Sequence, residues 1–596
     1  MENKFVKSIL DEFTNDFKLE KLEISKRFEY LTNYLVVSKI HPDVFNALPD
    51  LQEIDVDNGS NFGIDGIAII INNNLLVNKD DIEIYKRSKD LDIRIIFTQS
   101  KTSPSYDSGS IYKFIGAVQN FFAENNDINL TAEVKYFKDI YNYLFEHNNA
   151  RLINKNSPRC ELLFSTTAKP INDPVIEGIA KQGEKNILQA CSELKYVKIH
   201  LLGADYIIDT YNEIENRYET VINFKNNLTL DRIKGVEQSY IGYLNYIEFL
   251  KLVTDKDGTL RRNLFYENVR DYQGSDNKVN LEISETLSEH ELRDKFILLN
   301  NGITVVANYL KALGSNDYEI RDYQIVNGCQ TSTILYNHNS ILSTADNFYV
   351  PIKIIHTNDG DVINRIIKAT NRQTPVPDEA FVALDKFHKR LQEYYVVMSE
   401  EMPEKLFYER RSKEYTNSEK RIEKNQIINL HSQIRSFTAI FLALPQLVYN
   451  NNPNEILRTK EKLLFQENHS HISYYTASYI LNGFQKEIMN GNIQPTFGSF
   501  RYYFGLIYRV LSTYEFKNPF LSSGKMNEYC YKIINSLNDD EKRKVLFHKA
   551  CEIIKISITA EKQKLNNGRI SIRSLMRTIS FKDEIFNQLK IYMARK

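Results

Sequence analysis

The stretch IRIIFTQSKTS, residues 93–103, decides the predicted fold of the first part of the chain. It begins as an apolar β-strand and ends in polar residues. Because side chains alternate across a strand, Gln99 and Lys101 continue the face that carries Ile95 and Phe97. Such a strand end either reaches solvent or provides Lys101 with a partner, since burying an unpaired ammonium is costly.

A second apolar run, GIDGIAIII at residues 63–71, carries Asp65 at the head of a face made of isoleucines. If the two strands run antiparallel in one sheet, the start of one lies beside the end of the other. Asp65, Gln99 and Lys101 then converge at one edge. There Asp65 satisfies Lys101 directly, as a structural ion pair, or through a bound metal ion.

The same residues carry the chemistry that phosphodiester hydrolysis needs. A hard cation takes oxygen ligands, and Asp65, Gln99 and the backbone carbonyl of Ser100 supply them. Lys101 can orient the attacking water and oppose the negative charge that grows in the transition state. The predicted cofactor is Mg²⁺, for which Mn²⁺ can substitute.

These residues resemble the PD-(D/E)XK nuclease superfamily, and within it the Mrr-type restriction enzymes, which use Gln in the second half-motif. The matching residues are GID at 63–65 and QSK at 99–101. The resemblance implies a restriction-endonuclease-like α/β fold and catalytic roles for Asp65, Gln99 and Lys101. It also implies support from Glu29, on the helix RFEYLTNYL. The alternatives are a structural Lys–Asp pair and a degenerate, inactive nuclease fold.

The 596 residues predict roughly two to four domains. We expect an α/β nuclease-like domain at 1–217, which includes a strand at LQEIDVD (51–57), and a mixed α/β domain at 218–420. Residues 421–596 are predicted to be mainly α-helical and are basic after about residue 500. The last 96 residues carry 19 Lys and Arg against 9 Asp and Glu, which favours polyanion binding or a solvated helical surface.

Polar clusters follow apolar segments in the middle region, at NNGIT (300–304), IVNGCQT (325–331) and ATNRQTPV (369–376). Asn-Gly pairs favour tight turns with positive φ. After the second pair a predicted helix opens with free backbone N–H groups, which can bind phosphate. A plain turn is the alternative for each cluster. The chain has no GxxxxGK[ST] motif, so a Walker-type ATPase is excluded.

Together with LFYENVRDYQG (264–274) and FYERR (407–411), these clusters resemble the AIPR family, the bacterial abortive-infection phage-resistance proteins. The motifs occur in the order found in that family. The NGxQT turn is also similar to the DGxHR and ParB-like proteins, some of which bind nucleotides. Here Gln330 and Thr331 replace the His-Arg pair of that pattern.

Two further sets of candidate residues follow from these patterns. The candidates for ligand or phosphate binding are Asn301, Gly302, Asn327, Gly328, Gln330, Thr331, Arg372, Gln373, Arg410 and Arg411. The candidates for a nucleic-acid surface are Arg569, Arg573, Arg577 and Lys582. Neutralising several phosphates makes binding strongly salt-dependent. Surface ion pairs, which contribute only about 0–1 kcal/mol each, are the alternative for single arginines.

The location is predicted from what the sequence lacks. The five cysteines are scattered without a CxxC pattern, which argues against zinc and for a reducing cytosol. The sequence has neither a signal peptide nor an apolar run of about 20 residues, so we expect a cytoplasmic protein without a membrane partner.

The predicted function is a Mg²⁺-dependent nuclease of antiphage defence, with DNA favoured over RNA as substrate. A phage-derived trigger and a second copy of the chain are further candidate partners. The alternative is a non-catalytic phage sensor, or a nucleic-acid- or nucleotide-binding regulator, built on a degenerate nuclease scaffold.

Overall fold

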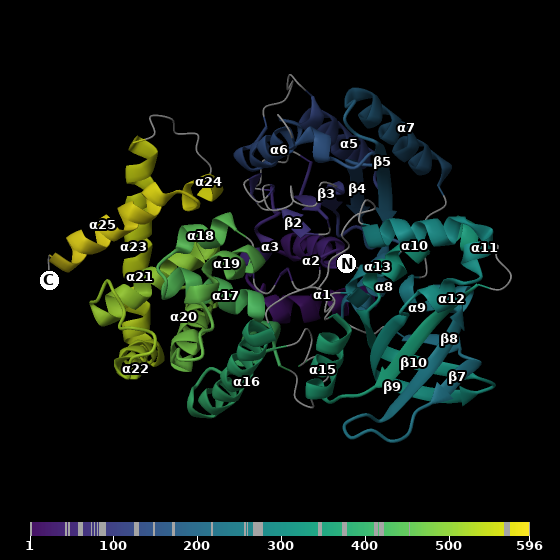
Figure 1. Cartoon of the computed structure of the whole chain (residues 1–596). Coiled ribbons are helices and arrows are strands. Elements are labelled where there is room, and N and C mark those ends of the chain that lie inside the picture. Colours follow the sequence, from purple (N-terminus) through teal and green to yellow (C-terminus); the bar gives the residue numbers. More distant parts are fainter. Residues whose placement is uncertain are drawn as a thin grey trace. The chain divides into compact units, whose positions relative to one another are not determined.

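The computed structural model of the chain divides into two compact units (Figure 1). Unit 1 comprises Met1–Val37, Asp43–Ile208 and Asp378–Lys596, and unit 2 comprises Ser38–Pro42 and Asp209–Pro377. The first and last parts of the sequence therefore share one unit. The predicted boundaries at residues 217 and 420 stay predictions.

The structure describes residues 3–41, 44–45, 48–57, 63–72, 74–76, 78–79, 82, 91–123, 130–146, 149–169, 173–215, 219–255, 258, 260–265, 278–343, 348–371, 378–410, 415, 422–451, 453–564 and 572–594.

The first part of unit 1 is built on a five-stranded sheet with the order β2-β1-β3-β4-β5. β1 is antiparallel to β2 and β3, whereas β3, β4 and β5 are parallel. Every residue of β1 is buried, as expected for a strand covered on both faces. The strands are β1 (Gly66–Ile71), β2 (Asn74–Leu76), β3 (Ile93–Ser100), β4 (Arg159–Ser165) and β5 (Tyr196–Leu202).

Helices connect the parallel strands, because a parallel pair needs a long crossover. The side chain of Asp107 caps α5 and that of Asp173 caps α7. Both are favourable N-cap residues, since their carboxylates accept from free backbone N–H groups. The helices are α1 (Lys4–Phe17), α2 (Ile24–Ser38), α3 (Leu48–Leu51), α5 (Ser108–Phe122), α6 (Ala132–Phe145), η3 (Ala150–Leu152), α7 (Pro174–Ala190) and α8 (Ala204–Ile214).

One expected strand of this region is wrong. The alternation in LQEIDVD (51–57) predicted a strand, but α3 and a turn occupy its start. Only an isolated antiparallel bridge between Asp55 and Gly66 remains. The backbone carbonyls of Gln52 and Asp55 accept hydrogen bonds from the guanidinium of Arg573, at 2.6 and 2.8 Å. A tertiary contact therefore forms hydrogen bonds with backbone carbonyls that, in a longer strand, would bond to a neighbouring strand.

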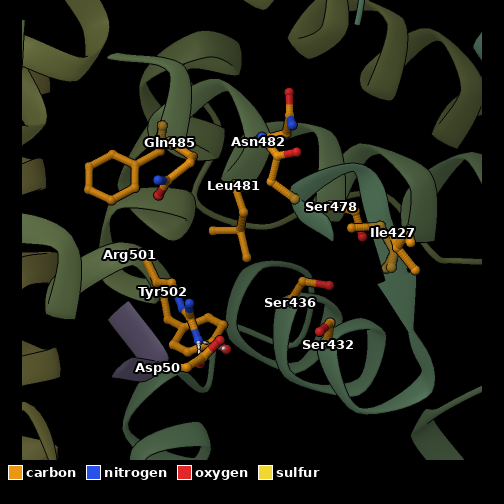
Figure 2. A pocket seen from close by; sticks show the side chains of 13 residues that line it. Asp50, Ile427, Ser432, Ser436, Ser478, Leu481, Asn482, Gln485, Arg501 and Tyr502 are labelled. Carbon is orange, nitrogen blue, oxygen red and sulfur yellow. Dashed lines mark hydrogen bonds and ion pairs between the residues drawn. The ribbon is translucent and has the colours of Figure 1, made fainter. Parts of the chain in front are cut away.

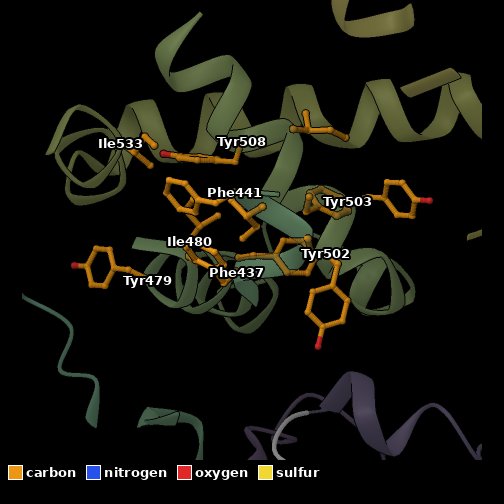
Figure 3. Close-up of a cluster of buried hydrophobic side chains, with 14 of the residues drawn as sticks. Phe437, Phe441, Tyr479, Ile480, Tyr502, Tyr503, Tyr508 and Ile533 are labelled. Atoms are coloured by element: carbon orange, nitrogen blue, oxygen red, sulfur yellow. The ribbon is translucent and has the colours of Figure 1, made fainter. Parts of the chain in front are cut away.

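The last part of unit 1 is helical, as predicted, apart from the short parallel pair β12 and β13. Its core is rich in aromatic side chains, part of which Figure 3 shows. The rings of Phe437 and Tyr474 stack with centroids 3.8 Å apart. The elements are α16 (Asp378–Glu401), β12 (Phe407–Glu409), η5 (Lys424–Gln426), β13 (Ile427–Asn429), α17 (Leu430–Ile440), α18 (Pro445–Asn450), α19 (Pro453–Lys460), η6 (Glu461–Leu463), α20 (His471–Met489), η7 (Pro495–Phe500), α21 (Arg501–Thr513), α22 (Lys525–Asn538), α23 (Asp540–Lys564), α24 (Ile572–Met576) and α25 (Ile579–Ala594).

Unit 2 is mixed α/β, also as predicted, with a six-stranded sheet in the order β6-β10-β9-β11-β8-β7. β9 and β11 are parallel, and the other neighbours are antiparallel. The strands are β6 (Glu219–Asn223), β7 (Asn226–Thr229), β8 (Gln238–Asn245), β9 (Ile303–Gly314), β10 (Asp317–Asn327) and β11 (Tyr349–His356). The helices are α9 (Tyr246–Val253), η4 (Arg262–Phe265), α10 (Lys278–Ser288), α11 (His290–Arg293), α12 (Phe296–Leu299), α13 (Cys329–Asn337), α14 (Asn339–Leu342) and α15 (Gly360–Asn371).

The five cysteines are all free and buried. Within the ranges that the structure describes, no helix is both long enough and apolar enough to cross a membrane.

Candidate metal centre

The two apolar strands pair as the site prediction required. β1 runs antiparallel to β3, with Gly66 opposite Thr98. One position further, the N–H of Asp65 donates to the carbonyl of Thr98 at 2.9 Å. Asp65 and Gln99 therefore lie at the same edge of the sheet.

The carboxylate of Asp65 is buried at this edge, with only 6% of the residue exposed. Its Oδ2 accepts a hydrogen bond from the N–H of Ser100 at 2.6 Å. Burial raises the pKa of Asp65 to about 8, and the negative charge of Glu29 adds to this rise. The Ser100 N–H and the positive charge of Lys101 act in the opposite direction. A bound cation would favour the ionised form.

Gln99 presents an acceptor without a partner. The residue is 4% exposed, and among the described residues its Oε1 has no hydrogen-bond partner. A buried acceptor left unpaired costs about 1–3 kcal/mol, so such an atom calls for an explanation. Coordination of a cation by this amide oxygen provides one, and it agrees with the predicted role of Gln99.

Two further carboxylates join Asp65. Glu29 on α2, Asp57 just after the Asp55–Gly66 bridge, and Asp65 each place one carboxylate oxygen within 4.8 Å of the other two. We call these three residues the acidic cluster. Oxygen ligands grouped in this way suit a hard divalent cation, which needs few protein ligands because it keeps several waters. The residues present therefore fit Mg²⁺ or Mn²⁺.

A lysine that the sequence analysis did not single out lies against the acidic cluster. The Nζ of Lys26 is 2.9 Å from Oε2 of Glu29 and 3.9 Å from Oδ2 of Asp57. It also lies 2.9 Å from Oδ1 of Asp55, whose Oδ2 accepts from the hydroxyl of Tyr30 at 2.9 Å. Burial by itself lowers the pKa of Lys26, but Asp55 and Glu29 raise it above its ordinary value. Lys26 is therefore a cation.

Lys101 is half-buried at the end of β3. Its backbone N–H donates to the carbonyl of Ser165 on the neighbouring strand at 2.8 Å. Its ammonium lowers the pKa of Asp65, which places its charge within electrostatic reach of the acidic cluster. Ser100, predicted to offer its carbonyl, is seen to contribute its N–H to Asp65.

Close packing fixes α2, and with it Glu29, against the sheet. The hydroxyl of Thr98 donates to Oδ1 of Asn33, one helical turn from Glu29, at 2.6 Å. A Cβ atom at Gly66 would lie 2.6 Å from both of these side-chain oxygens. Only glycine permits this approach without a shift of α2.

Asp57, Asp55 and Lys26 were missed because each belongs to a pattern with an ordinary explanation. Asp55 and Asp57 alternate in LQEIDVD, which was assigned to a strand. Lys26 and Glu29 form an (i, i+3) pair, which is common on solvated helices. Two acids spaced by two residues, just before the GID motif, were the available signal.

In unit 2 the structure brings the two Asn-Gly turns together. Gly302 and Gly328 have φ values of +81° and +97°, which confirms the predicted positive φ. A Cβ atom at Gly328 would lie 3.3 Å from the carbonyl oxygen of Gly302. We call Asn301, Gly302, Asn327, Gly328, Gln330 and Thr331 the NG cluster.

The side chains of Gln330 and Thr331, in the first turn of α13, already have hydrogen-bond partners. Oε1 of Gln330 accepts from Asn280 at 2.9 Å, and Oγ1 of Thr331 accepts from Asn300 at 3.3 Å. Asn301 is exposed and Asn327 half-buried. The positive φ of each turn was predicted, their closeness was not, and the use of the NG cluster for binding stays a prediction.

The predicted basic residues take up contacts within unit 1. Arg410 donates from Nε to Gln392 at 2.7 Å. The guanidinium groups of Arg573 and Arg577 lie over the rings of Phe137 and Tyr136, each 5.5 Å from the centroid. Lys582 lies 3.4 Å from Asp583. Arg372, Gln373, Arg411 and Arg569 lie outside the described residues.

A cleft of about 90 Å³, lined by both apolar and polar side chains, lies elsewhere in unit 1 (Figure 2). At one side Arg501 on α21 pairs with Asp50 on α3. Ser432 on α17 and Asn482 on α20 also line the cleft. Its residues come from segments more than 400 positions apart in the sequence, so no local motif predicted it.

Comparison with known proteins gives one match. A family model described as AIPR protein matches residues 265–591, more than half of the chain. Searches of curated proteins and of solved structures found no match. The matched range holds the NG cluster and most of the helical part of unit 1. The acidic cluster precedes it in the sequence.

Proposed function

Because the chain belongs to the AIPR family, which indicates abortive-infection phage defence, we propose that it acts there as a Mg²⁺-dependent nuclease. The acidic cluster beside the unpartnered Oε1 of Gln99 is the observation that carries this proposal. The first part of unit 1 is proposed to be a restriction-endonuclease-like domain. The order β2-β1-β3-β4, which places Asp65 beside the end of β3, supports that assignment.

The residues have distinct proposed roles. Glu29, Asp57 and Asp65 would hold the ion through carboxylate oxygens, and Gln99 through its amide oxygen. When bound, Mg²⁺ lowers the pKa of a water and offsets charge on the phosphate. Lys101, at the rim of the cluster, would orient the attacking water and oppose the charge on the transition state. Water then attacks the phosphorus, the P–O bond to the leaving sugar oxygen breaks, and that oxygen takes up a proton.

DNA is the favoured substrate, because the restriction enzymes that the first domain resembles cut DNA. The residues named contact phosphate and metal and do not read the sugar, so RNA is tested in parallel. Cleavage of supercoiled plasmid and of a structured RNA by the purified chain, with Mg²⁺ or with EDTA, separates the two substrates.

A non-catalytic sensor or regulator is the second candidate. It is favoured by the family match, which covers the NG cluster and not the acidic cluster. Phage challenge of cells distinguishes the two. The nuclease proposal expects protection to be lost with Lys101→Ala. The sensor proposal expects Lys101→Ala to protect cells, whereas changes at Asn327 or Gln330 do not.

The phage assay also tests for a nuclease that is inactive in purified form because its trigger is missing. If the purified chain cuts neither substrate, loss of protection with Lys101→Ala still supports catalysis. Full protection by that variant, at equal protein level, would overturn it.

A further inference from the structure

Lys26 places a cation directly against the acidic cluster. Its ammonium is 2.9 Å from Glu29, 2.9 Å from Asp55 and 3.9 Å from Asp57. It also donates to the carbonyl of Asp57 at 3.1 Å. Half-buried carboxylates this close together would repel one another without such a counter-charge.

Glu29 is the carboxylate that Lys26 shares with the candidate metal site. Its Oε2 contacts Lys26, while the residue also belongs to the acidic cluster. A metal ion that binds Glu29 through this oxygen would therefore compete with an ammonium. The buried, unpartnered Oε1 of Gln99 is a separate sign that this edge accepts a cation.

Asp55 holds Lys26 from the other side, outside the acidic cluster. The hydroxyl of Tyr30 and the N–H of Asp57 donate to its two carboxylate oxygens, at 2.9 and 3.1 Å. Arg573 on α24 fixes its backbone carbonyl. Asp55 is thus positioned to remain paired with Lys26 when Glu29 binds another cation.

We propose that Lys26 is a built-in counter-cation of the metal site: it holds Glu29 in the metal-free protein, and it releases Glu29 to a divalent cation while Asp55 retains it. This inference rests on the proposed function, because it presumes that the acidic cluster binds metal. Lys26 is a positioning residue in this scheme and does not contact the reacting phosphate.

The experiment measures binding of MnCl₂ to the full-length protein by calorimetry, together with melting temperature with and without Mn²⁺. Lys26→Met removes the charge and keeps a chain of similar length, whereas Lys26→Arg keeps the charge. Lys564→Met is the matched control, since that lysine also pairs with two carboxylates, at 2.7 and 2.8 Å, but on α23 and α25.

We expect Lys26→Met to bind Mn²⁺ at least about tenfold more tightly than the wild type, because a competing positive charge is gone. Its metal-free melting temperature should fall, and Mn²⁺ should raise it by more than in the wild type. Lys26→Arg and Lys564→Met should bind as the wild type does. Unchanged or weaker binding by folded Lys26→Met would overturn the inference.

Asp55→Asn provides a second test of the inference, which does not depend on Lys26→Met alone. Without its carboxylate, Lys26 should hold Glu29 more tightly, so Mn²⁺ binding weakens. In Lys26→Met the same Asp55 change should have little further effect. An equal loss in both backgrounds would show that Asp55 acts only through its general electrostatic attraction for Mn²⁺, and it would overturn the inference.

The two proposals fail differently. If neither wild type nor folded Lys26→Met binds Mn²⁺, the metal site itself is wrong, and with it the proposed function. If the wild type binds and Asp65→Asn abolishes binding, but Lys26→Met changes nothing, only the role of Lys26 is wrong.

Discussion

The acidic cluster of unit 1 and the NG cluster of unit 2 each contain residues that the sequence singles out at the ends of apolar strands, Asp65 in the first and Asn327 in the second. In the NG cluster, Gln330 and Thr331 are hydrogen-bonded to neighbouring asparagines. In the acidic cluster three carboxylates lie close together, and Gln99 keeps an acceptor without a partner among the described residues. A polar motif indicates a ligand site most strongly when folding leaves its binding capacity unfilled.

The largest effect on cleavage is expected from a change in the acidic cluster. Asp65→Asn keeps the shape of the side chain and an oxygen for the Ser100 N–H, but removes the charge. Because metal assistance supplies several kcal/mol, we expect Mg²⁺-dependent cleavage to fall by at least about 10³-fold. Plasmid nicking and Mn²⁺ calorimetry measure this. Wild-type cleavage by the variant would reject Asp65 as a metal ligand.

Lys101→Met should come next, with a loss of about 10²–10³-fold in cleavage rate, since one charged group facing the transition state is removed. Mn²⁺ binding should persist, because Lys101 is not a ligand. The matched control is Lys181→Met, an exposed lysine of α7 that lies 3.8 Å from Glu177. A loss of Mn²⁺ binding instead of rate would assign Lys101 a structural role.

Two glycines allow a matched test of packing. Gly66→Ala would place a methyl group 2.6 Å from Asn33 and Thr98, and Gly328→Ala would strain a backbone with φ of +97°. Each change should lower the free energy of unfolding by about 1–3 kcal/mol. Only Gly66→Ala should also weaken Mn²⁺ binding, because α2 carries Glu29. Equal Mn²⁺ affinities in two folded variants would contradict the proposed link between α2 and the metal site.

The smallest effect is expected in the NG cluster. Gln330→Ala removes the hydrogen bond from Asn280, which should lower the free energy of unfolding by about 1 kcal/mol. Denaturant unfolding measures the change, with Mn²⁺ affinity as the internal control. If this variant keeps its stability but abolishes phage protection, the NG cluster is a binding site and the comparison must be revised.

Sequence alone was sufficient for the features that depend on local periodicity. Alternation along two strands placed Asp65 and Gln99 at one sheet edge, and the Asn-Gly pairs predicted positive φ at Gly302 and Gly328. The helical character of the last part of the chain was also evident. These predictions succeed because side-chain direction and backbone preference are set by near neighbours in the chain.

Only the tertiary structure decided which other side chains reach the acidic cluster. Asp57 lies on the irregular segment before β1, and Lys26 lies on α2, which packs closely against Gly66. The expected strand at 51–57 gave way to a turn whose carbonyls are held by Arg573, more than 500 residues away in the sequence. Contacts of this kind leave no periodic signal, because they are chosen by the fit of whole elements and not by the order of neighbouring residues.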